Sequence, residues 1–328
     1  MIRNHGRTFA ILAALAIAGC SKDDDDSPTH PAGDRPPIRI AFLSERPPSQ
    51  PFSSDVYFYD ASTGAAAYAP PNVNTTSAEG PCGISGDGKH LAFFSNRQAT
   101  GTIATLFLYD VTTGAVSLPH WASTLFDVNN PALSRDGRYV AFQYAVDADL
   151  FVGVEDLVGD QLLPLGSLNQ TGVLSFDPSL NSDGTLVAFS SNRPGAGGFD
   201  IFLYSVPGDS LIPLPGLNST ASDLAPSLSG DGRYIAFQSG RVGQTGGVID
   251  VFLYDRQSQS LVPLPNANTA LADYLPSLSP DGRYLVYTTD SVGGRDVRVY
   301  DVSARRLLSL SGLNDPYFYD YFPSVADH

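Results

Sequence analysis

Lysine is scarce in this sequence. Only Lys22 and Lys89 are lysines among 19 basic residues, and 34 acidic residues bring the net charge to −15. Phosphate backbones are bound by clustered cations, so this balance argues against a nucleic-acid partner. It favours a soluble, self-repelling surface or a cationic partner.

Catalytic signatures are missing as well. The sequence contains no GxSxG nucleophile elbow and no phosphate-cradling glycine motif between a strand and a helix. Beyond the N-terminal segment, histidines occur only at unrelated repeat positions: His30, His90, His120 and His328. This placement predicts neither a metal cluster nor a His-based acid/base pair. We therefore expect no catalysis, no metal and no cofactor.

No apolar run at the N-terminus is long enough to span a bilayer. Arg3 and Arg7 precede the apolar segment 9–18, so residues 1–19 are typical of a targeting segment. The segment closes on the letters IAGC, which resemble the lipobox of bacterial lipoproteins. In that family cleavage precedes the cysteine, here Cys20, whose thiol takes a diacylglycerol. An ordinary secretory signal with a chance cysteine is the alternative.

The segment 20–37 is expected to be a lipidated cysteine followed by a flexible acidic tether, because its Pro- and Asp-rich composition buries little surface. Lys22 followed by the acids 23–26 resembles the surface-export signal of Bacteroidetes lipoproteins, or is only a solvated tether. The expected location is the bacterial cell envelope, anchored by lipid at the outer membrane, either periplasmic or surface-exposed. With Cys20 acylated, Cys82 has no partner for an intrachain disulfide. Counted from its proline, Cys82 takes the position of Ser227, which predicts a small buried residue and not a nucleophile.

One segment is repeated along the chain. The stretch PSLSPDGRYLVY begins at Pro276, and its copies begin at Pro81, Pro131, Pro178, Pro226 and Pro323, at intervals of 47 to 50 residues. The Asp-Gly pair predicts a tight hairpin, in which Gly282 adopts a positive φ. Each period then adds an aromatic run, such as DVFLYD from Asp250, and a fourth apolar run. Four short strands per repeat, without helical periodicity, are typical of a β-propeller blade.

The two chain ends complete one repeat. The first repeat lacks its first strand, which Pro323-Ser324-Val325 can supply to the segment 38–42. The sequence therefore predicts an all-β, six-bladed β-propeller of four-stranded blades over residues 38–328. Pairing of the C-terminal strand with the N-terminal blade closes the ring and leaves no unpaired edge.

The SxDG and FLYD elements, present throughout residues 38–328, resemble the WD40-like repeat of TolB-type propellers. Similar blades occur in prolyl-oligopeptidase propellers and in oligogalacturonate lyases. The resemblance departs at the N-terminus, where TolB itself carries an α/β domain that has no counterpart in this sequence.

In such a blade, the connections from strand two to three and from strand four to the next blade emerge on one face, which we call the loop face. The Asp-Gly turns emerge on the other face. The candidate binding residues of the loop face are the recurring arginines Arg46, Arg97, Arg193 and Arg241, the acids Asp223, Asp273 and Asp320, and the aromatics Trp121, Tyr274, Tyr317 and Tyr319. The charged set forms either an Arg-Asp latch or a rim that recognises a charged peptide or an ion. The aromatics either cover blade tops or form a surface for sugar stacking or protein binding.

Together these features predict a non-enzymatic, lipid-anchored, monomeric envelope protein whose propeller is a binding platform for other envelope proteins. The alternative is a surface glycan-binding protein, or a polysaccharide lyase or hydrolase, that uses the loop aromatics.

Overall fold

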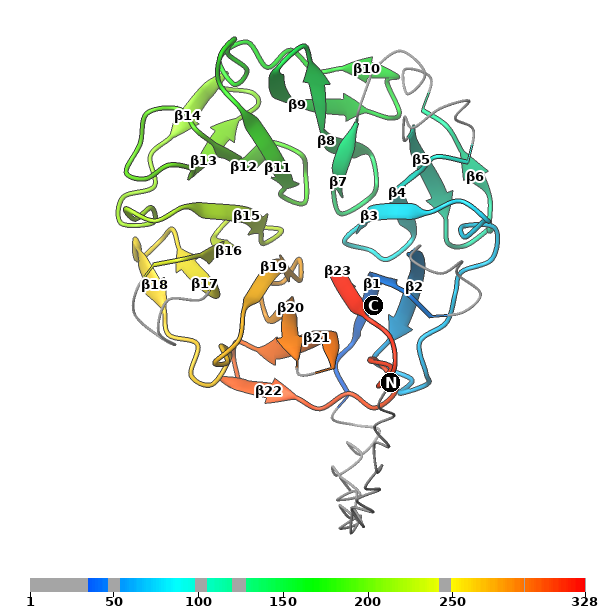
Figure 1. Cartoon of the computed structure of the whole chain (residues 1–328). Coiled ribbons are helices and arrows are strands. Elements are labelled where there is room, and N and C mark those ends of the chain that lie inside the picture. The colour runs from blue at the N-terminus through cyan, green and yellow to red at the C-terminus, as the bar shows by residue number, and fades with distance from the viewer. Residues whose placement is uncertain are drawn as a thin grey trace, which may run out of the picture.

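The computed structural model describes residues 35–46, 54–97, 105–119, 128–241, 249–291 and 293–327. The expected signal segment and nearly all of the expected tether lie outside these ranges. The described part forms six antiparallel sheets arranged radially around a central channel, which confirms the predicted six-bladed β-propeller (Figure 1). It contains no helix with the length and hydropathy of a membrane span.

We number the blades I to VI in chain order. Blade I contains β1 (Ile38–Ser44), β2 (Asp55–Asp60) and the C-terminal β23 (Asp320–Asp327). Blade II contains β3 (Glu79–Ile84), β4 (His90–Ser95), β5 (Thr105–Asp110) and β6 (Val116–Ser117). Blade III contains β7 (Asn129–Leu133), β8 (Tyr139–Val146), β9 (Asp149–Asp156) and β10 (Gln161–Leu162).

The other three blades repeat this order from the channel outwards. Blade IV contains β11 (Ser175–Leu180), β12 (Leu186–Ser191), β13 (Asp200–Ser205) and β14 (Ser210–Ile212). Blade V contains β15 (Asp223–Leu228), β16 (Tyr234–Ser239), β17 (Asp250–Asp255) and β18 (Ser260–Val262). Blade VI contains β19 (Asp273–Leu278), β20 (Tyr284–Ser291), β21 (Gly294–Asp301) and β22 (Arg306–Leu308).

The ring closes as predicted. Strand β23 pairs antiparallel with β1, from Ile38 opposite Asp327 to Ser44 opposite Asp320. In blade I the fourth-strand position is reduced to a single bridge between Phe58 and Tyr68. The propeller begins and ends at the Asp-Gly face, where the Asp327 N–H donates to the Gly86 carbonyl of the blade II turn at 3.0 Å.

The Asp-Gly hairpins have the predicted geometry. In blade VI, Gly282 has a φ of 72° and its N–H donates to the Ser279 carbonyl at 2.8 Å. The Ser279 hydroxyl donates to Asp281 at 2.5 Å and accepts the Tyr284 N–H at 2.9 Å. The side chains of the SxDG motif therefore provide hydrogen-bond partners for the backbone of the turn. Gly88, Gly137, Gly184 and Gly232 repeat the positive φ.

The hydrophobic core lies between blades. Phe237 and Leu228 of blade V pack with Leu203 of blade IV, whereas Leu253 of blade V packs with Tyr287 of blade VI. Alternate side chains of a strand point to opposite sheet faces, so each central strand contributes to two neighbouring clusters. Strict alternation along the repeats thus produces one cluster at each junction.

Candidate functional site

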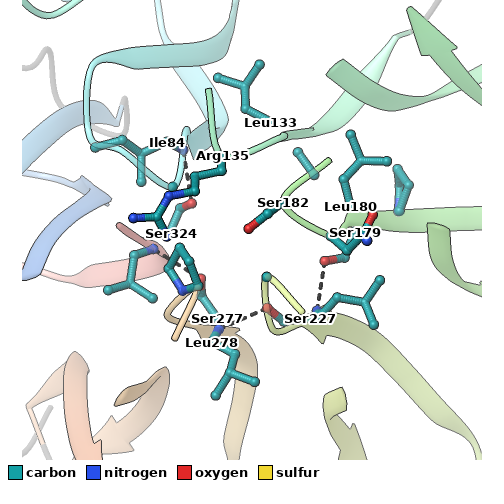
Figure 2. A pocket seen from close by; sticks show the side chains of 18 of the residues that line it. Ile84, Leu133, Arg135, Ser179, Leu180, Ser182, Ser227, Ser277, Leu278 and Ser324 are labelled. Atoms are coloured by element: carbon teal, nitrogen blue, oxygen red, sulfur yellow. Dashed lines mark hydrogen bonds between the residues drawn. The ribbon is translucent and has the colours of Figure 1, made fainter. Parts of the chain in front are cut away.

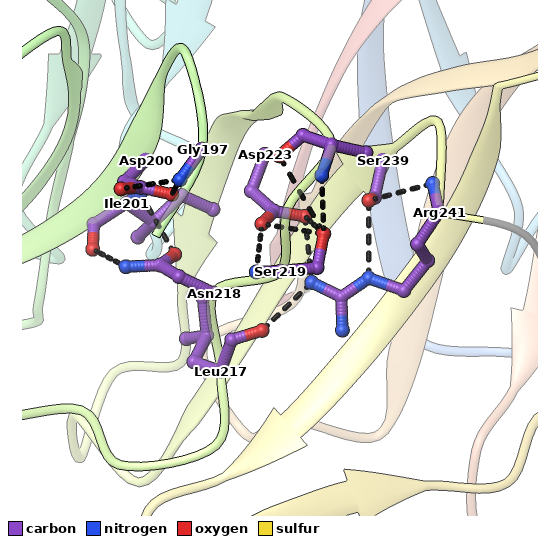
Figure 3. A network of polar contacts seen from close by, with 10 residues as sticks. Gly197, Asp200, Ile201, Leu217, Asn218, Ser219, Asp223, Ser239 and Arg241 are labelled. Carbon is purple, nitrogen blue, oxygen red and sulfur yellow. Dashed lines mark hydrogen bonds and ion pairs between the residues drawn. The ribbon is translucent and has the colours of Figure 1, made fainter. Parts of the chain in front are cut away.

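Three of the four recurring arginines form ion pairs within their own blades. Arg46 contacts Asp320 at 2.7 Å, Arg97 contacts Glu79 at 3.1 Å, and Arg241 contacts Asp223 at 2.6 Å. The three acidic side chains are 0% exposed. Figure 3 shows the blade V pair, in which Arg241 also donates to the Leu217 carbonyl of the entering connection at 2.7 Å. This geometry is that of a latch between a blade and the connection that leads into it.

The environment of these pairs is aromatic. The Arg241 guanidinium lies over Phe237 at 4.9 Å and over Phe252 at 5.0 Å from the ring centroids. Burial raises the pKa of Glu79 to about 7, although hydrogen bonds from Thr75 and the neighbouring Arg97 oppose that rise. Guanidinium groups held between rings and a buried acid leave little surface for a ligand.

Within the described ranges, two blades carry one half of the latch without the other. Arg193 of blade IV meets the Ser175 hydroxyl at 3.2 Å, where other blades have an acid. Burial lowers the pKa of Arg193. In blade VI, Asp273 is fully buried and its Oδ1 makes no hydrogen bond, because Ser291 stands where other blades have arginine.

The recurring asparagines bind neighbouring backbone. In blade IV, the Asn218 amide accepts the Ile201 N–H at 3.0 Å and donates to the Ile201 carbonyl at 2.9 Å (Figure 3). Asn74, Asn169, Asn268 and Asn314 bind the third strand of a blade in the same manner. These side chains bond the start of each third strand, where the fourth strand does not reach it.

The predicted aromatics of the loop face divide into exposed and packed residues. Tyr317 is 79% exposed and Tyr319 is 41% exposed. Tyr319 lies over Gly294 so closely that a Cβ there would come within 2.4 Å of its ring. The Tyr274 hydroxyl donates to Asp290 at 2.9 Å, and burial together with that carboxylate raises its pKa to about 12. Trp121 lies outside the described residues.

A bulge in each first strand shapes the channel mouth at the loop face. The pairing register between the first and second strands shifts one to two residues after the acid position. In five blades, the residue before the channel proline has a positive φ. These residues are Asn130, Asp177, Ala225, Leu275 and Phe322. Blade II differs because Pro81 occupies that position and cannot adopt a positive φ.

The register of blade II corrects the interpretation of Cys82. Gly83 lies opposite Ala92 just as Ser227 lies opposite Ala236, so Gly83 is the equivalent of the serine and Cys82 the equivalent of the proline. The sequence-based alignment on Pro81 was wrong by one residue. Cys82 is buried, and burial raises the pKa of its thiol to about 12, consistent with the inert residue that was expected.

Side chains of one blade bind the bulges of the next. The Gln143 carbonyl accepts the Asp177 N–H at 3.3 Å, and the Gln238 carbonyl accepts the Leu275 N–H at 2.8 Å. Ser190 binds the Ala225 N–H, and Thr288 binds the Phe322 N–H. Blade I has Leu43 at this position, and the bulge of blade II has Pro81, which has no N–H to donate.

Towards the Asp-Gly face, a second set of hydrogen bonds surrounds a cavity of about 170 Å³ (Figure 2). The hydroxyls of Ser179, Ser227, Ser277 and Ser324 each accept an N–H from the next blade. Arg135 of blade III pairs with Asp327 of blade I at 3.0 Å. Burial and the nearby Asp281 raise the pKa of Asp327. The sequence did not reveal these contacts, because their partners lie 48 or more residues apart in the chain.

The loop-face end of the channel forms a cavity of about 110 Å³, which we call the mouth cavity. Its lining includes Pro81, Asn130, Asp177, Ala225, Leu275 and Phe322. Asn130 donates to Asp177 at 2.6 Å. Burial raises the pKa of Asp177 to about 6, although hydrogen bonds from Asn130 and from the Ala225 N–H oppose that rise. The mouth cavity thus has a polar sector from blades III and IV and an apolar sector from the others.

Within the described ranges, no three His, Cys, Asp or Glu side chains are grouped to hold a metal ion. No protein-family model matches the chain, and no curated protein matches it.

Solved structures share the fold at low sequence identity. TolB from Acinetobacter baumannii matches with a TM-score of 0.65 and 20% identity, over 88% of this chain and 66% of that chain. A putative TolB from Agrobacterium tumefaciens matches with a TM-score of 0.60 and 16% identity, over 89% of this chain and 99% of that chain. An oligogalacturonate lyase in complex with manganese matches with a TM-score of 0.51 and 14% identity, over 75% of this chain and 70% of that chain. These matches support the TolB-like propeller fold.

Proposed function

We propose that this protein is a non-enzymatic, lipid-anchored component of the bacterial cell envelope whose propeller binds another protein at its loop face. The observation that carries this proposal is an aromatic surface on blades VI and I, where Tyr317 and Tyr319 are exposed. Arg295 lies 5.5 Å from the Tyr321 ring, and Tyr321 contacts Phe322 of the mouth cavity with centroids 5.7 Å apart. Tyrosine and arginine are enriched among the few residues that carry most of the binding energy of protein interfaces.

The binding proposal is tested by capture from an envelope extract with the full chain carrying Cys20→Ser. A partner should be recovered by this chain and lost when Tyr317 and Tyr319 are both changed to alanine. Tyr68→Ala is the matched control, because Tyr68 is 44% exposed at the outer edge of blade I. Equal recovery by all three proteins, or no recovery by any, contradicts the proposal.

The anchor is tested separately. Cys20 ends the IAGC sequence, and its replacement by serine should move the protein from the membrane fraction to the soluble fraction. Continued membrane association of the Cys20→Ser chain rejects lipidation at this residue.

The second candidate function is glycan binding at the cell surface. The exposed rings of Tyr317 and Tyr319 favour it, since aromatic faces beside a concave mouth also suit sugars. Binding of purified polysaccharide that depends on both tyrosines, without a captured protein, supports this alternative over the first.

A further inference from the structure

Asp177 places a carboxylate in the mouth cavity without a cationic partner among the described residues. Its contacts are the Asn130 amide, which donates at 2.6 Å, the Ala225 N–H, and the Gln143 carbonyl, which accepts its own N–H. It forms none of the ion pairs found in the described ranges. Asp177 is partly buried. A carboxylate partly withdrawn from water is less favourable without a cation than with one.

The fold does not require an acid at this position. Asp177 has a φ of 50°, and Ala225 and Leu275 adopt φ values of 50° and 52° at the equivalent positions of their blades. All three are held by the same hydrogen bond from the preceding blade. An alanine and a leucine therefore support the bulge as well as the aspartate does, so the positive φ does not itself require an acid at this position.

The opposite side of the mouth cavity is apolar. Leu275 and Phe322 line it, together with the ring of channel prolines. Its volume of about 110 Å³ is somewhat smaller than the cavity of about 150 Å³ that accepts benzene in another protein. The cavity therefore suits a small group that carries a positive charge at one end and a short hydrocarbon chain at the other.

We propose that the mouth cavity binds an alkylammonium group, with the ammonium at Asp177 and the alkyl chain against Leu275 and Phe322. This inference rests on the proposed function where the group belongs to a partner protein, as a lysine side chain or an N-terminal amine. A free small amine has the same chemistry. The two groups that hydrogen-bond the carboxyl, the Asn130 amide and the Ala225 N–H, do not titrate. Binding should accordingly weaken as the pH falls below about 6, where the carboxyl takes up a proton.

The test is an NMR titration of the full chain carrying Cys20→Ser with n-butylammonium, and with 1-butanol as the neutral isostere. Nα-acetyl-lysine methylamide and a short peptide with a free N-terminus are the arms that represent a protein source. Asp177→Asn keeps the shape and the positive φ. Asp147→Asn is the matched control, because Asp147 is exposed and has a φ of 55°.

We expect n-butylammonium to bind the parent chain and the Asp147→Asn chain equally, and to bind the Asp177→Asn chain at least 10-fold more weakly. 1-Butanol should also bind the parent at least 10-fold more weakly than the amine. Melting of the Asp177→Asn chain at or above the parent temperature shows that the fold is intact. Equal amine affinity of the parent and Asp177→Asn, or no saturable binding of any amine, overturns the inference.

Parallel capture from the envelope extract separates this inference from the proposed function. A protein captured through Tyr317 and Tyr319, combined with amine binding that ignores Asp177, overturns the inference alone. Amine binding that requires Asp177, with no protein captured, supports the inference with a free amine as its source and contradicts the protein-binding proposal.

Discussion

The serine hydrogen bonds between blades predict opposite effects for two conservative substitutions. Ser227 of blade V accepts the Leu278 N–H of blade VI at 2.9 Å. Ala132 is its equivalent in blade III, because each lies opposite the alanine of its second strand. Ser227→Ala removes an acceptor from a backbone donor at the channel wall, whereas Ala132→Ser offers one to Leu180 of blade IV.

The expected magnitudes differ because losing a partner and gaining one are not symmetrical. Leaving a buried N–H without an acceptor costs about 1–3 kcal/mol, whereas a new hydrogen bond contributes about 0.5–1.5 kcal/mol. Ser227→Ala should therefore lower the free energy of unfolding by about 2 kcal/mol. Ala132→Ser should raise it by about 1 kcal/mol. A domain of this size changes its Tm by about 2 °C per kcal/mol.

Urea unfolding followed by circular dichroism measures both effects on the Cys20→Ser background. Ser258→Ala is the control, since Ser258 is exposed and its hydroxyl bonds only the neighbouring Ser260. Amide hydrogen exchange should report faster exchange at Leu278 in the Ser227→Ala chain. The interpretation fails if both substitutions shift stability in the same direction, or if Ser227→Ala is as neutral as the control.

Three further outcomes follow from the latch, a buried acid and the closure. Ser175→Asp should give Arg193 the carboxylate that other blades provide and raise the free energy of unfolding by about 1 kcal/mol or more, measured in urea; a loss of stability contradicts this. Burial and nearby carboxylates raise the pKa of Glu155 to about 7, so the native state retains its proton more strongly than the unfolded chain does. Parent stability should then fall as the pH rises from about 4.5 to about 7, and Glu155→Gln should remove that decline in a pH series of melting curves; parallel curves refute it. Deletion of residues 321–328 removes nearly all of β23 and should abolish cooperative unfolding, whereas an unchanged melting temperature contradicts the closure.

The repeating pattern was sufficient to predict the architecture. The Asp-Gly hairpins, the blade number and the closure by β23 follow from local turn chemistry and from the split repeat, both of which are visible along the chain. The register of blade II was not predictable from the proline alone. Counted from Glu79, the blade has the same spacing as blade V from Asp223, and this acid was the better reference point.

The candidate site depended on contacts that sequence spacing does not contain. The latch was one of two open interpretations of the Arg and Asp sets, and the ion pairs together with the burial of Asp223 and Asp320 favour it. The sequence did not predict Asp177 as a site residue, because its neighbours in the mouth cavity come from several blades. One signal was available in the sequence: Asp177 is acidic, whereas Asn130, Ala225, Leu275 and Phe322 precede the channel prolines of other blades.

Both ends of the propeller lie at the Asp-Gly face, so the two faces of the disc differ in their distance from the chain ends. Strand β1 starts at Ile38 beside Asp327, and runs from there towards the loop face. If the N-terminal segment carries the proposed lipid, the anchor joins the propeller on the side of the disc that carries the Arg135–Asp327 pair. The exposed tyrosines lie at the loop face, on the opposite side of the disc, so the proposed binding surface would face away from the proposed anchor.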